Sequence, residues 1–465
     1  MGATYDSQER FPAPRCFPGT RGEILEKIEK WVNAGGEGKR VLWLHGPAGA
    51  GKSAIAQTVA ETCAGRNQLA ATFFFARTVA GRNAIKYLFP TVAVQIALSA
   101  REKRERLYTI LKNDPWIADR ASGSVDLVTL LFKKRSDLVP SLPFLVIVDG
   151  LDECQGHGDQ CRILTQVSHM VNPHCHLPLR FLIVSRPESH LLEAFKDPAI
   201  ANIAERLSLY GDFQAHDDVF MYLRSEFSRI HDSQKHRDVM EFVPRPWPSD
   251  DAMQQIACKS GGYFIYASTI IKFIDEEDFS PTACLGQVLD TCNPPLNSTL
   301  FSELDKLYLQ ILSLCPTSNL PILKYVLGCI VVPLLGYDRT TPAGILMDMD
   351  VIEAFLGLPR GHAKLILRRL RSLVSFGESP EDVELPRLYH ASFGDFLLDQ
   401  ERSRDYHVDS EEWMYNAFCD AFSLGCKMLG FKFPTDTNSE SISQHPAKGL
   451  FVTLTSFFLK FDLSL

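Results

Sequence analysis

The sequence predicts an α/β protein in which a parallel sheet with helices on both faces is followed by a helical domain and a third domain of short helices and a strand. Short apolar segments alternate with helical segments over residues 21–212, which is the pattern of a parallel sheet with right-handed crossovers. After residue 212 the pattern becomes mostly helical. A length of 465 residues also predicts about three domains, at roughly 100–200 residues each.

The predicted sheet domain contains five apolar segments that are typical of strands. The segment 144–148 is continuously apolar, as a strand buried on both faces should be. Residues 101–106, REKRER, are expected to form a solvated helix face, and residues 1–20, polar and rich in Pro and Gly, a linker. Predicted strands lie at 41–45, 69–76, 144–148, 181–185 and 203–210, and predicted helices at 21–32, 52–62 and 83–99.

The remainder of the chain is predicted to be mainly helical. An amphipathic helix is expected at 217–230, before a Pro- and Trp-rich stretch at 243–250. Between 251 and 400 the clear strand-like exception is 383–389, and short helices followed by a strand are typical of a winged-helix module. We therefore predict a linker (1–20), a sheet domain (21–212), a helical domain (213–300), a winged-helix domain (301–408) and a C-terminal helix with an irregular tail (409–465).

Composition and charge exclude several classes of protein. Hydrophobic residues make up 45% and charged residues 22%, which excludes a disordered tail protein, a collagen and a disulfide scaffold. The net charge of −8 makes neither nucleic acid nor an acidic membrane surface an expected partner. The N-terminus lacks the apolar core of a signal peptide, and the apolar run 325–335 is too short to span a membrane and contains Pro333. The 12 cysteines follow no regular spacing, so we expect reduced thiols in a cytoplasmic protein.

The segment 46–53 carries the most specific motif. It satisfies the pattern G-x-x-x-x-G-K-[ST] between a short apolar strand and a helix, the context in which this phosphate-binding loop occurs. Its glycines let backbone N–H groups surround phosphate oxygens, and the helix N-terminus adds a favourable dipole. Lys52 would contact the β- and γ-phosphates of ATP or GTP, and Ser53 would bind Mg²⁺ through its hydroxyl. The predicted nucleotide-binding residues are Gly46, Pro47, Ala48, Gly49, Ala50, Gly51, Lys52 and Ser53.

Two later strands carry the candidate catalytic residues. Asp149 ends a buried apolar strand, where it would orient Mg²⁺. Glu153, or as a second choice Asp152, would polarise the attacking water. Arg186 follows the next strand, where it would contact the γ-phosphate; the alternative is an ion pair with a neighbouring acid such as Glu188. Together with the loop at 46–53, these residues predict a P-loop NTPase.

The same motifs, in the same order, resemble the NACHT-domain NTPases of fungi. These belong to the signal-transducing NTPases with numerous domains, and the resemblance extends to the N-terminal NTPase region of nephrocystin-3. It covers about residues 16–410. The segments that carry it are CFPGTR (16–21), WLHGPAGAGKSAIAQTVA (43–60), FLVIVDGLDEC (144–154), FLIVSRPE (181–188), GGYFIYAS (261–268) and LYHASFGDFLLD (388–399).

This resemblance implies a nucleotide-operated switch. In such proteins the NTPase, helical and winged-helix domains close over a bound nucleotide, and exchange of diphosphate for triphosphate opens them and drives homo-oligomerisation. The resemblance also implies slow hydrolysis, signalling protein partners of unknown identity, and a role in fungal self/non-self recognition or programmed cell death. His390 matches a histidine that touches the β-phosphate in related receptors. The proline that packs on the adenine in those receptors has no counterpart in 261–266, so Tyr263 or Phe264 is the candidate to stack on the base, and ATP and GTP both stay open.

Two other functions are also compatible with the sequence. The first is a non-hydrolysing interaction scaffold that keeps nucleotide as a structural cofactor. The second is a DNA-binding ATPase in which the basic segment 360–371, RGHAKLILRRLR, acts as a recognition helix. The apolar positions Leu365, Ile366, Leu370 and Leu373 favour instead the packing of this helix within its own domain.

Overall fold

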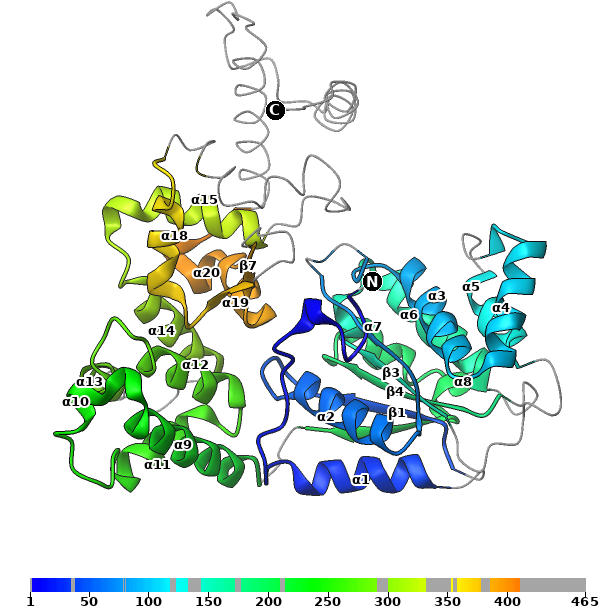
Figure 1. Ribbon diagram of the computed structural model, residues 1–465, viewed down its shortest axis with the longest axis horizontal. Coiled ribbons are helices and arrows are strands. Elements are labelled where there is room, and N and C mark those ends of the chain that lie inside the picture. The colour runs from blue at the N-terminus through cyan, green and yellow to red at the C-terminus, as the bar shows by residue number, and fades with distance from the viewer. Residues whose placement is uncertain are drawn as a thin grey trace, which may run out of the picture. The chain divides into compact units, whose positions relative to one another are not determined.

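The computed structural model (Figure 1) describes residues 2–34, 38–77, 79, 81–117, 123–132, 144–171, 177–209, 214–290, 300–331, 353, 358–377 and 385–409. The chain divides into two compact units, Met1–Pro294 and Pro295–Leu465. Beyond Asp409, the predicted C-terminal helix and tail lie outside the described residues.

Within the described part of the first unit, five strands form one parallel sheet in the order β2-β3-β4-β1-β5. All of them were predicted from the apolar segments, to within a few residues at each end. β4 pairs with β1 on one side and with β3 on the other, so that Ser185 lies opposite His45 and Val184 opposite Asp149. The C-terminal ends of β1, β3 and β4 therefore meet at one edge of the sheet. The strands are β1 (Val41–His45), β2 (Leu69–Phe74), β3 (Phe144–Asp149), β4 (Leu179–Ser185) and β5 (Ala204–Ser208).

Helices cover both faces of this sheet, as the sequence predicts (Figure 1). Because successive side chains of a strand point to opposite faces, Leu42 and Leu44 pack with α1 (Gly22–Asn33) and α2 (Lys52–Gly65), whereas Trp43 packs with the helices of the other face. Those helices are α3 (Ile85–Leu98), α5 (Gly123–Leu130), α6 (His157–Val171), α7 (Ser189–Ala194) and α8 (Pro198–Ala201).

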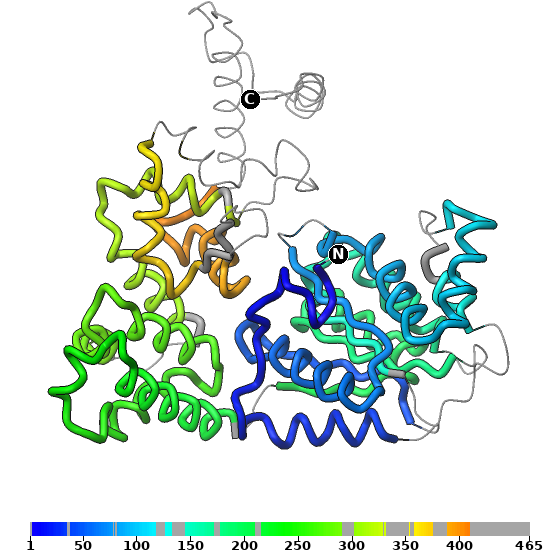
Figure 2. Tube along the Cα trace, viewed as in Figure 1, coloured from blue at the N-terminus to red at the C-terminus, as the bar shows by residue number. Residues whose placement is uncertain are grey.

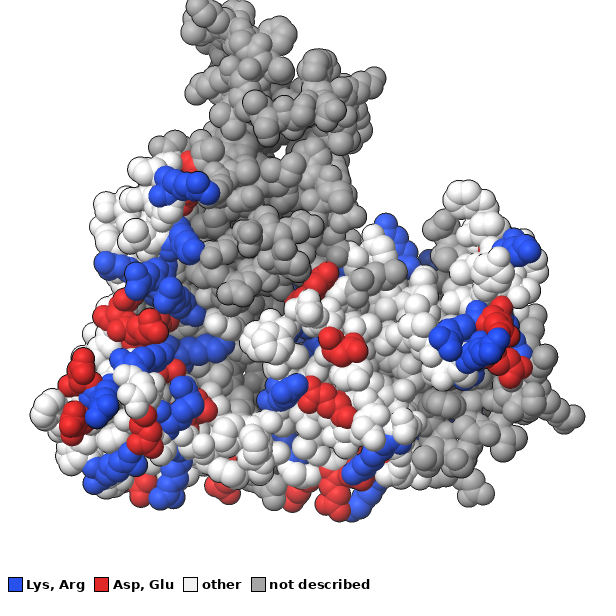
Figure 3. Space-filling model, in the orientation of Figure 1, with Lys and Arg blue, Asp and Glu red and all other residues white. Residues whose placement is uncertain are grey.

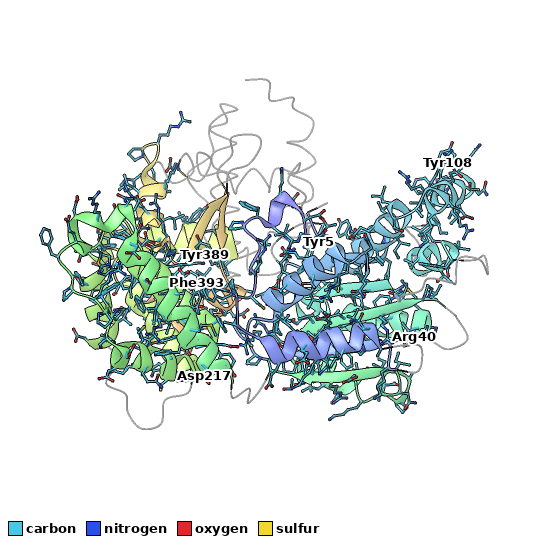
Figure 4. The ribbon with its side chains drawn as sticks, turned by 60° about the horizontal axis from the view of Figure 1, so that its bottom comes forward. Tyr5, Arg40, Tyr108, Asp217, Tyr389 and Phe393 are labelled. Carbon is cyan, nitrogen blue, oxygen red and sulfur yellow. The ribbon has the colours of Figure 1, made fainter. Side chains whose placement is uncertain are left out.

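The charged segment at 101–106 lies on α4 (Arg101–Asn113), which contains no buried residue. Tyr108, labelled in Figure 4, is 68% exposed on this helix. The prediction of a solvated helix face is confirmed.

The N-terminal segment, predicted as a linker, instead packs against the sheet domain (Figure 2). Ala3 is fully buried, its carbonyl accepts from the Phe74 N–H, and the Tyr5 N–H donates to Thr72 Oγ1. Figure 4 shows Tyr5 beside this domain. The physical reason is that β2 is an edge strand, whose outward backbone groups need partners. A short 3₁₀ helix, η1 (Gln8–Arg10), lies in the same segment.

In the described part of the first unit, five α-helices follow β5. The predicted helix at 217–230 is the central part of α9, where Phe227 and Ile230 are buried. α11 begins after Ser249, whose hydroxyl accepts from the Ala252 N–H, and ends at Gly261, whose φ of +54° favours glycine. These helices are α9 (Gln214–Asp232), α10 (Arg237–Met240), α11 (Asp250–Ser260), α12 (Phe264–Ile274) and α13 (Pro281–Asp290), with η5 (Gln234–His236) before α10.

The second unit contains helices followed by a two-stranded antiparallel hairpin. The strand predicted at 383–389 is β7 (Leu385–Leu388), and it pairs with β6 (Val374–Gly377), which the sequence analysis missed because it directly follows a helical pattern. Phe393, labelled in Figure 4, is buried, and the centre of its ring lies 5.0 Å from the centre of the Tyr308 ring. The remaining elements are α14 (Leu300–Leu312), η6 (Thr317–Asn319), α15 (Leu320–Val331), α18 (His362–Leu367), η7 (Arg368–Leu370), α19 (Ala391–Leu397), α20 (Gln400–Ser403) and η8 (Arg404–Tyr406).

The basic segment at 360–371 forms α18 and η7 rather than one long helix. Ile366, Leu370 and Leu373 are buried, as predicted, but Leu365 is 66% exposed, because it lies one position off the buried face. Lys and Arg side chains gather over this end of the second unit (Figure 3). Arg369 donates through Nη1 to the Leu314 carbonyl, a contact with its own unit. In the described part of the chain, no helix has both the length and the apolar character needed to cross a bilayer.

Candidate nucleotide site

The loop at 46–53 joins the end of β1 to the start of α2 and requires glycine at two positions. Gly49 and Gly51 have φ values of +75° and +87°, in the left-handed region that disfavours side chains. A Cβ atom on Gly49 would also lie 2.1 Å from Ile265 Cγ2. Within the loop, Gly46, Pro47 and Ala50 are buried, whereas Ala48, Gly49, Gly51, Lys52 and Ser53 are partly exposed. The sequence motif thus corresponds to a tight loop with its lysine at the start of a helix.

The Lys52 side chain turns back over this loop. Its Nζ donates to the carbonyl oxygens of Gly46 (2.9 Å) and Pro47 (2.7 Å). Burial lowers the pKa of Lys52 to about 8, although the nearby Asp152 and Asp149 carboxylates oppose this effect. The ammonium group is therefore incompletely compensated, and an anion in the loop would stabilise its charged form.

Ser53 and Asp149, the predicted Mg²⁺ ligands, are adjacent. The Ser53 hydroxyl forms a hydrogen bond with the Asp149 carboxylate, which is 4% exposed. Burial raises the pKa of Asp149, and its Oδ1 has no hydrogen-bond partner among the described residues. A buried carboxylate oxygen without a donor is unfavourable, whereas carboxylate and hydroxyl oxygens are ligands that Mg²⁺ prefers. These two residues fit a Mg²⁺ site.

Arg186 pairs with Asp152 rather than with Glu188, the partner considered from the sequence. Asp152 Oδ1 accepts from the Arg186 N–H at 2.9 Å, and Arg186 Nε lies 3.3 Å from Asp152 Oδ2. This pairing follows from the strand order, because β3 and β4 are neighbours and both residues lie just beyond their tips. Both oxygens of Asp152 are therefore engaged by one arginine.

Glu153 lies in the same turn and is only partly buried. Burial, followed by the charges of Asp152 and Asp149, raises the pKa of Glu153 to about 7. Its Oε2 accepts from the Arg77 N–H at 3.2 Å, a bond that opposes this rise. A carboxylate whose pKa lies near neutrality is suited to accept a proton from water.

Sequence reasoning assigned no role to Arg21, which joins the loop to the helices that follow the sheet. Its Nη2 donates to the Ala50 carbonyl (3.0 Å) and at longer range to the Gly262 carbonyl (3.4 Å), and its N–H donates to Asp218 Oδ2 (2.8 Å). Its guanidinium lies 5.2 Å from the centre of the Phe264 ring. The only sequence signal was its position in the CFPGTR segment.

The start of α12 also contacts the loop directly. The Ile265 N–H donates to the Gly49 carbonyl at 3.4 Å. Tyr263 packs against the core between the sheet and α1 and α2, and Phe264 lies 5.7 Å from Tyr222 between ring centres. Both candidates for base stacking thus lie beside residues that touch the loop, and their contact with a base stays a prediction.

Arg10 is a second residue that sequence reasoning missed. Its guanidinium lies 3.4 Å above the centre of the Phe74 ring and donates to Gln57 Oε1 at 2.8 Å. Burial lowers the pKa of Arg10 to about 10, and the charge of Asp149 opposes this. No local pattern in the polar N-terminal segment indicated this position.

His390 lies in the second unit, where it precedes α19 with extended backbone geometry. Its predicted contact with the β-phosphate stays a prediction.

Comparison with known proteins extends these observations. Three solved structures that are similar to this chain are each 14% identical to it. A Walker-type ATPase of Pyrococcus abyssi has a TM-score of 0.39, and the match covers 82% of this chain and 97% of that chain. For Cdc6p of Pyrobaculum aerophilum the TM-score is 0.36 and the coverages are 82% and 93%, and for the ORC2 protein of Aeropyrum pernix in ADPNP-ADP complexes the TM-score is 0.34 and the coverages are 89% and 96%. No curated protein matches the chain. Residues 19–186 match the family model described as Nephrocystin 3, N-terminal. The part of the chain that carries the loop, Glu153 and Arg186 is therefore similar to that family, as its motifs predict.

Proposed function

We propose that the chain is a nucleotide-operated switch that binds ATP or GTP with Mg²⁺ and hydrolyses it slowly. The observation that carries this proposal is the meeting of four features at the tips of β1, β3 and β4. They are the glycine-rich loop with Lys52, the Ser53–Asp149 pair, Glu153 with its raised pKa, and the Asp152–Arg186 ion pair.

Nucleotide binding would use groups that the loop already holds. Lys52 would exchange the carbonyl oxygens of Gly46 and Pro47 for phosphate oxygens, which carry more negative charge. The N-terminus of α2 would contribute its backbone N–H groups and dipole. Ser53 and Asp149 would hold Mg²⁺, which neutralises charge on the phosphates when bound.

Hydrolysis would use Glu153 as the general base. Its pKa of about 7 means that a large fraction of molecules carry the carboxylate at neutral pH. Asp152 is the weaker candidate, because Arg186 engages both of its carboxylate oxygens. Its proposed role is to hold Arg186, which would contact the γ-phosphate.

The contacts of the loop with Arg21 and Ile265 support a switch. Ile265 connects the Gly49 carbonyl to α12, and Arg21 connects the Ala50 carbonyl to α9 and to the turn between α11 and α12. A change in the loop on nucleotide exchange would therefore shift these helices as a body. The helices and the β6–β7 hairpin of the second unit support the proposal that this unit is the winged-helix domain of the switch. His390 would then be the residue of this domain that contacts the β-phosphate.

The triphosphate state would allow copies of the chain to associate and to reach signalling partners. A role in fungal self/non-self recognition or programmed cell death belongs to the same proposal and rests on the resemblance of the motifs.

Single-turnover hydrolysis of Mg²⁺–ATP, with Mg²⁺–GTP in parallel, tests the chemical part of the proposal. Glu153→Gln should reduce the rate by about a hundredfold or more, the usual contribution of a general base. Asp152→Asn should cause a smaller loss, through its hold on Arg186. Equal rates in the wild type and both variants would favour the non-hydrolysing scaffold.

Sedimentation velocity tests the switch itself. Glu153→Gln loaded with Mg²⁺–ATP should contain larger species than the same variant loaded with ADP, because the variant retains the triphosphate. Identical sedimentation with both nucleotides, and with GTP and GDP, would contradict a switch that acts by oligomerisation.

A further inference from the structure

A buried glutamine of α6 contacts the turn that carries Glu153. Gln160 is 3% exposed, and its side-chain Nε2 donates to the carbonyl oxygens of Asp152 (3.2 Å) and Cys154 (2.7 Å). These carbonyls belong to the residues on either side of Glu153. One amide group therefore spans the residue proposed as the general base.

The other end of this amide meets a histidine from a different segment. Gln160 Oε1 lies 2.6 Å from His190 Nε2. Because the two backbone carbonyls only accept hydrogen bonds, the amide nitrogen must face them and the amide oxygen must face His190. The His190 ring therefore donates through Nε2. Burial, and then the charge of His157, lowers the pKa of His190 and favours its neutral ring.

His190 belongs to the segment that follows Arg186. It lies in the first turn of α7, which begins at Ser189. The turn after β3 and the segment after β4 are thus joined twice, once through Gln160 and His190 and once through Asp152 and Arg186. The first connection ends on the carbonyls that flank Glu153 and on His190, four positions after Arg186, and the second ends on Arg186 itself.

We infer that Gln160 is a positioning residue, which holds the turn around Glu153 and, through His190, keeps it in register with Arg186. The inference rests on the proposed hydrolysis, because it assigns Gln160 a role in that reaction alone.

The geometry of the turn explains why such a support is needed. The turn is the single 3₁₀ segment η4 (Leu151–Glu153), which begins after Gly150 with φ +72°. The Asp152 and Cys154 carbonyls take no part in the sheet. Loss of the Gln160 amide would remove a buried donor from both of them and leave the Asp152 carbonyl with the longer bond from Arg77 Nη2 (3.5 Å). The turn would rearrange to recover hydrogen bonds, and a displacement of about 1 Å at a catalytic group costs about a hundredfold in rate.

Two substitutions separate positioning from packing. Gln160→Met keeps a side chain of similar length in the buried site but has no donor, and Gln160→Glu keeps the shape but presents only acceptors to the carbonyls when ionised. Thr165→Ala, at an exposed position of the same helix, is the matched control.

The measurements are the single-turnover rate and the affinity for fluorescent analogues of ATP and GTP, with Mg²⁺, on the full chain. Thermal melts check that each variant is folded. We expect both Gln160 variants to lose at least about tenfold in single-turnover rate, with a change in affinity of less than about twofold. Thr165→Ala should match the wild type in both.

His190→Ala provides the second arm of the test. It should reduce the rate less than Gln160→Met does, and the double variant should be no slower than Gln160→Met alone, because both act through one connection. Additive losses would overturn the link through His190.

The outcomes distinguish failure of this inference from failure of the proposed function. Wild-type rates in both Gln160 variants, or losses in rate that parallel losses in affinity or folded fraction, would overturn the positioning role and leave the switch intact. An absence of hydrolysis in the wild type would overturn the proposed chemistry and the positioning role with it.

Discussion

Replacing Glu153 by Gln removes a carboxylate whose charged form is disfavoured in the folded chain, so the variant should be more stable than the wild type. The pKa of Glu153 is about 7 in the folded chain, against an ordinary value of 4.5. Between these two pH values the folded state keeps a proton that the unfolded state has released. The free energy of unfolding therefore falls as pH rises from 4.5 to 7, and the full cost of the charge is present above pH 7.

The size of the effect follows from the same difference. At 1.36 kcal/mol for each unit of pKa, the difference corresponds to at most about 3 kcal/mol. Solvent reaches part of Glu153 and reduces this figure. A gain of about 1–3 kcal/mol would raise the melting temperature by roughly 2–12 °C in a domain of this size.

Thermal melts of nucleotide-free wild type and Glu153→Gln at pH 5 and pH 8 measure this gain. We expect a clear stabilisation at pH 8 that nearly disappears at pH 5. Glu205→Gln, at an exposed position of β5, is the control and should change the melting temperature little at either pH. A variant that is no more stable than the wild type at pH 8, or equally stabilised at both pH values, would refute the reasoning.

Three further predictions concern the loop, the N-terminal segment and the helices. Gly49→Ala should destabilise the chain, because residue 49 has a backbone φ of +75° and the new Cβ would lie 2.1 Å from Ile265 Cγ2. In urea unfolding, the same substitution should cost less free energy in an Ile265→Ala background, and an equal cost would argue against the contact. Arg10→Ala should reduce the free energy of unfolding by about 1–3 kcal/mol, because it removes the bond to Gln57 and the packing on Phe74. Arg15→Ala, which breaks an exposed ion pair, is the control and should cost less than about 1 kcal/mol. Equal costs of the two substitutions would count against the role of the N-terminal segment. Burial lowers the pKa of Lys272 to about 7, so the unfolded state binds the additional proton between pH 7 and 10.5 and wild-type stability should rise over that range. Lys272→Met should therefore raise the melting temperature most at pH 6 and progressively less towards pH 10, and a pH-independent difference would contradict this cause.

The elements that could be predicted from the sequence are those defined by neighbouring residues. β1 and β3 are short apolar segments that begin at the expected residue, and the loop between β1 and α2 is defined by its glycines, Lys52 and Ser53. The strand β6 was missed, because it directly follows a helix-like pattern; length is not the reason, since β7 also has four residues and was predicted. Local pattern thus suffices where burial and turn geometry are set within a few residues.

The supporting residues of the site depend on contacts between distant segments, which local pattern does not show. Arg21 bonds to Asp218, 197 positions away, and Gln160 reaches His190 across 30 positions. Arg10 lies beside the sheet because the preceding residues bond to β2, Ala3 through the Phe74 N–H and Tyr5 through the Thr72 hydroxyl. The choice of Asp152 over Glu188 as the partner of Arg186 likewise follows from the adjacency of β3 and β4, which is a property of the sheet order.

A calorimetric titration of Mg²⁺–ATP and Mg²⁺–GTP into the wild type and Lys52→Ala tests the central claim most directly. The wild type should bind at least one of them at a single site per chain, and a concentration of 100 times Kd should add about 2.7 kcal/mol to the free energy of unfolding. Lys52→Ala should lose this binding while remaining folded. Absence of binding in the wild type, or equal binding in both proteins, would contradict the assignment of the loop as a nucleotide site.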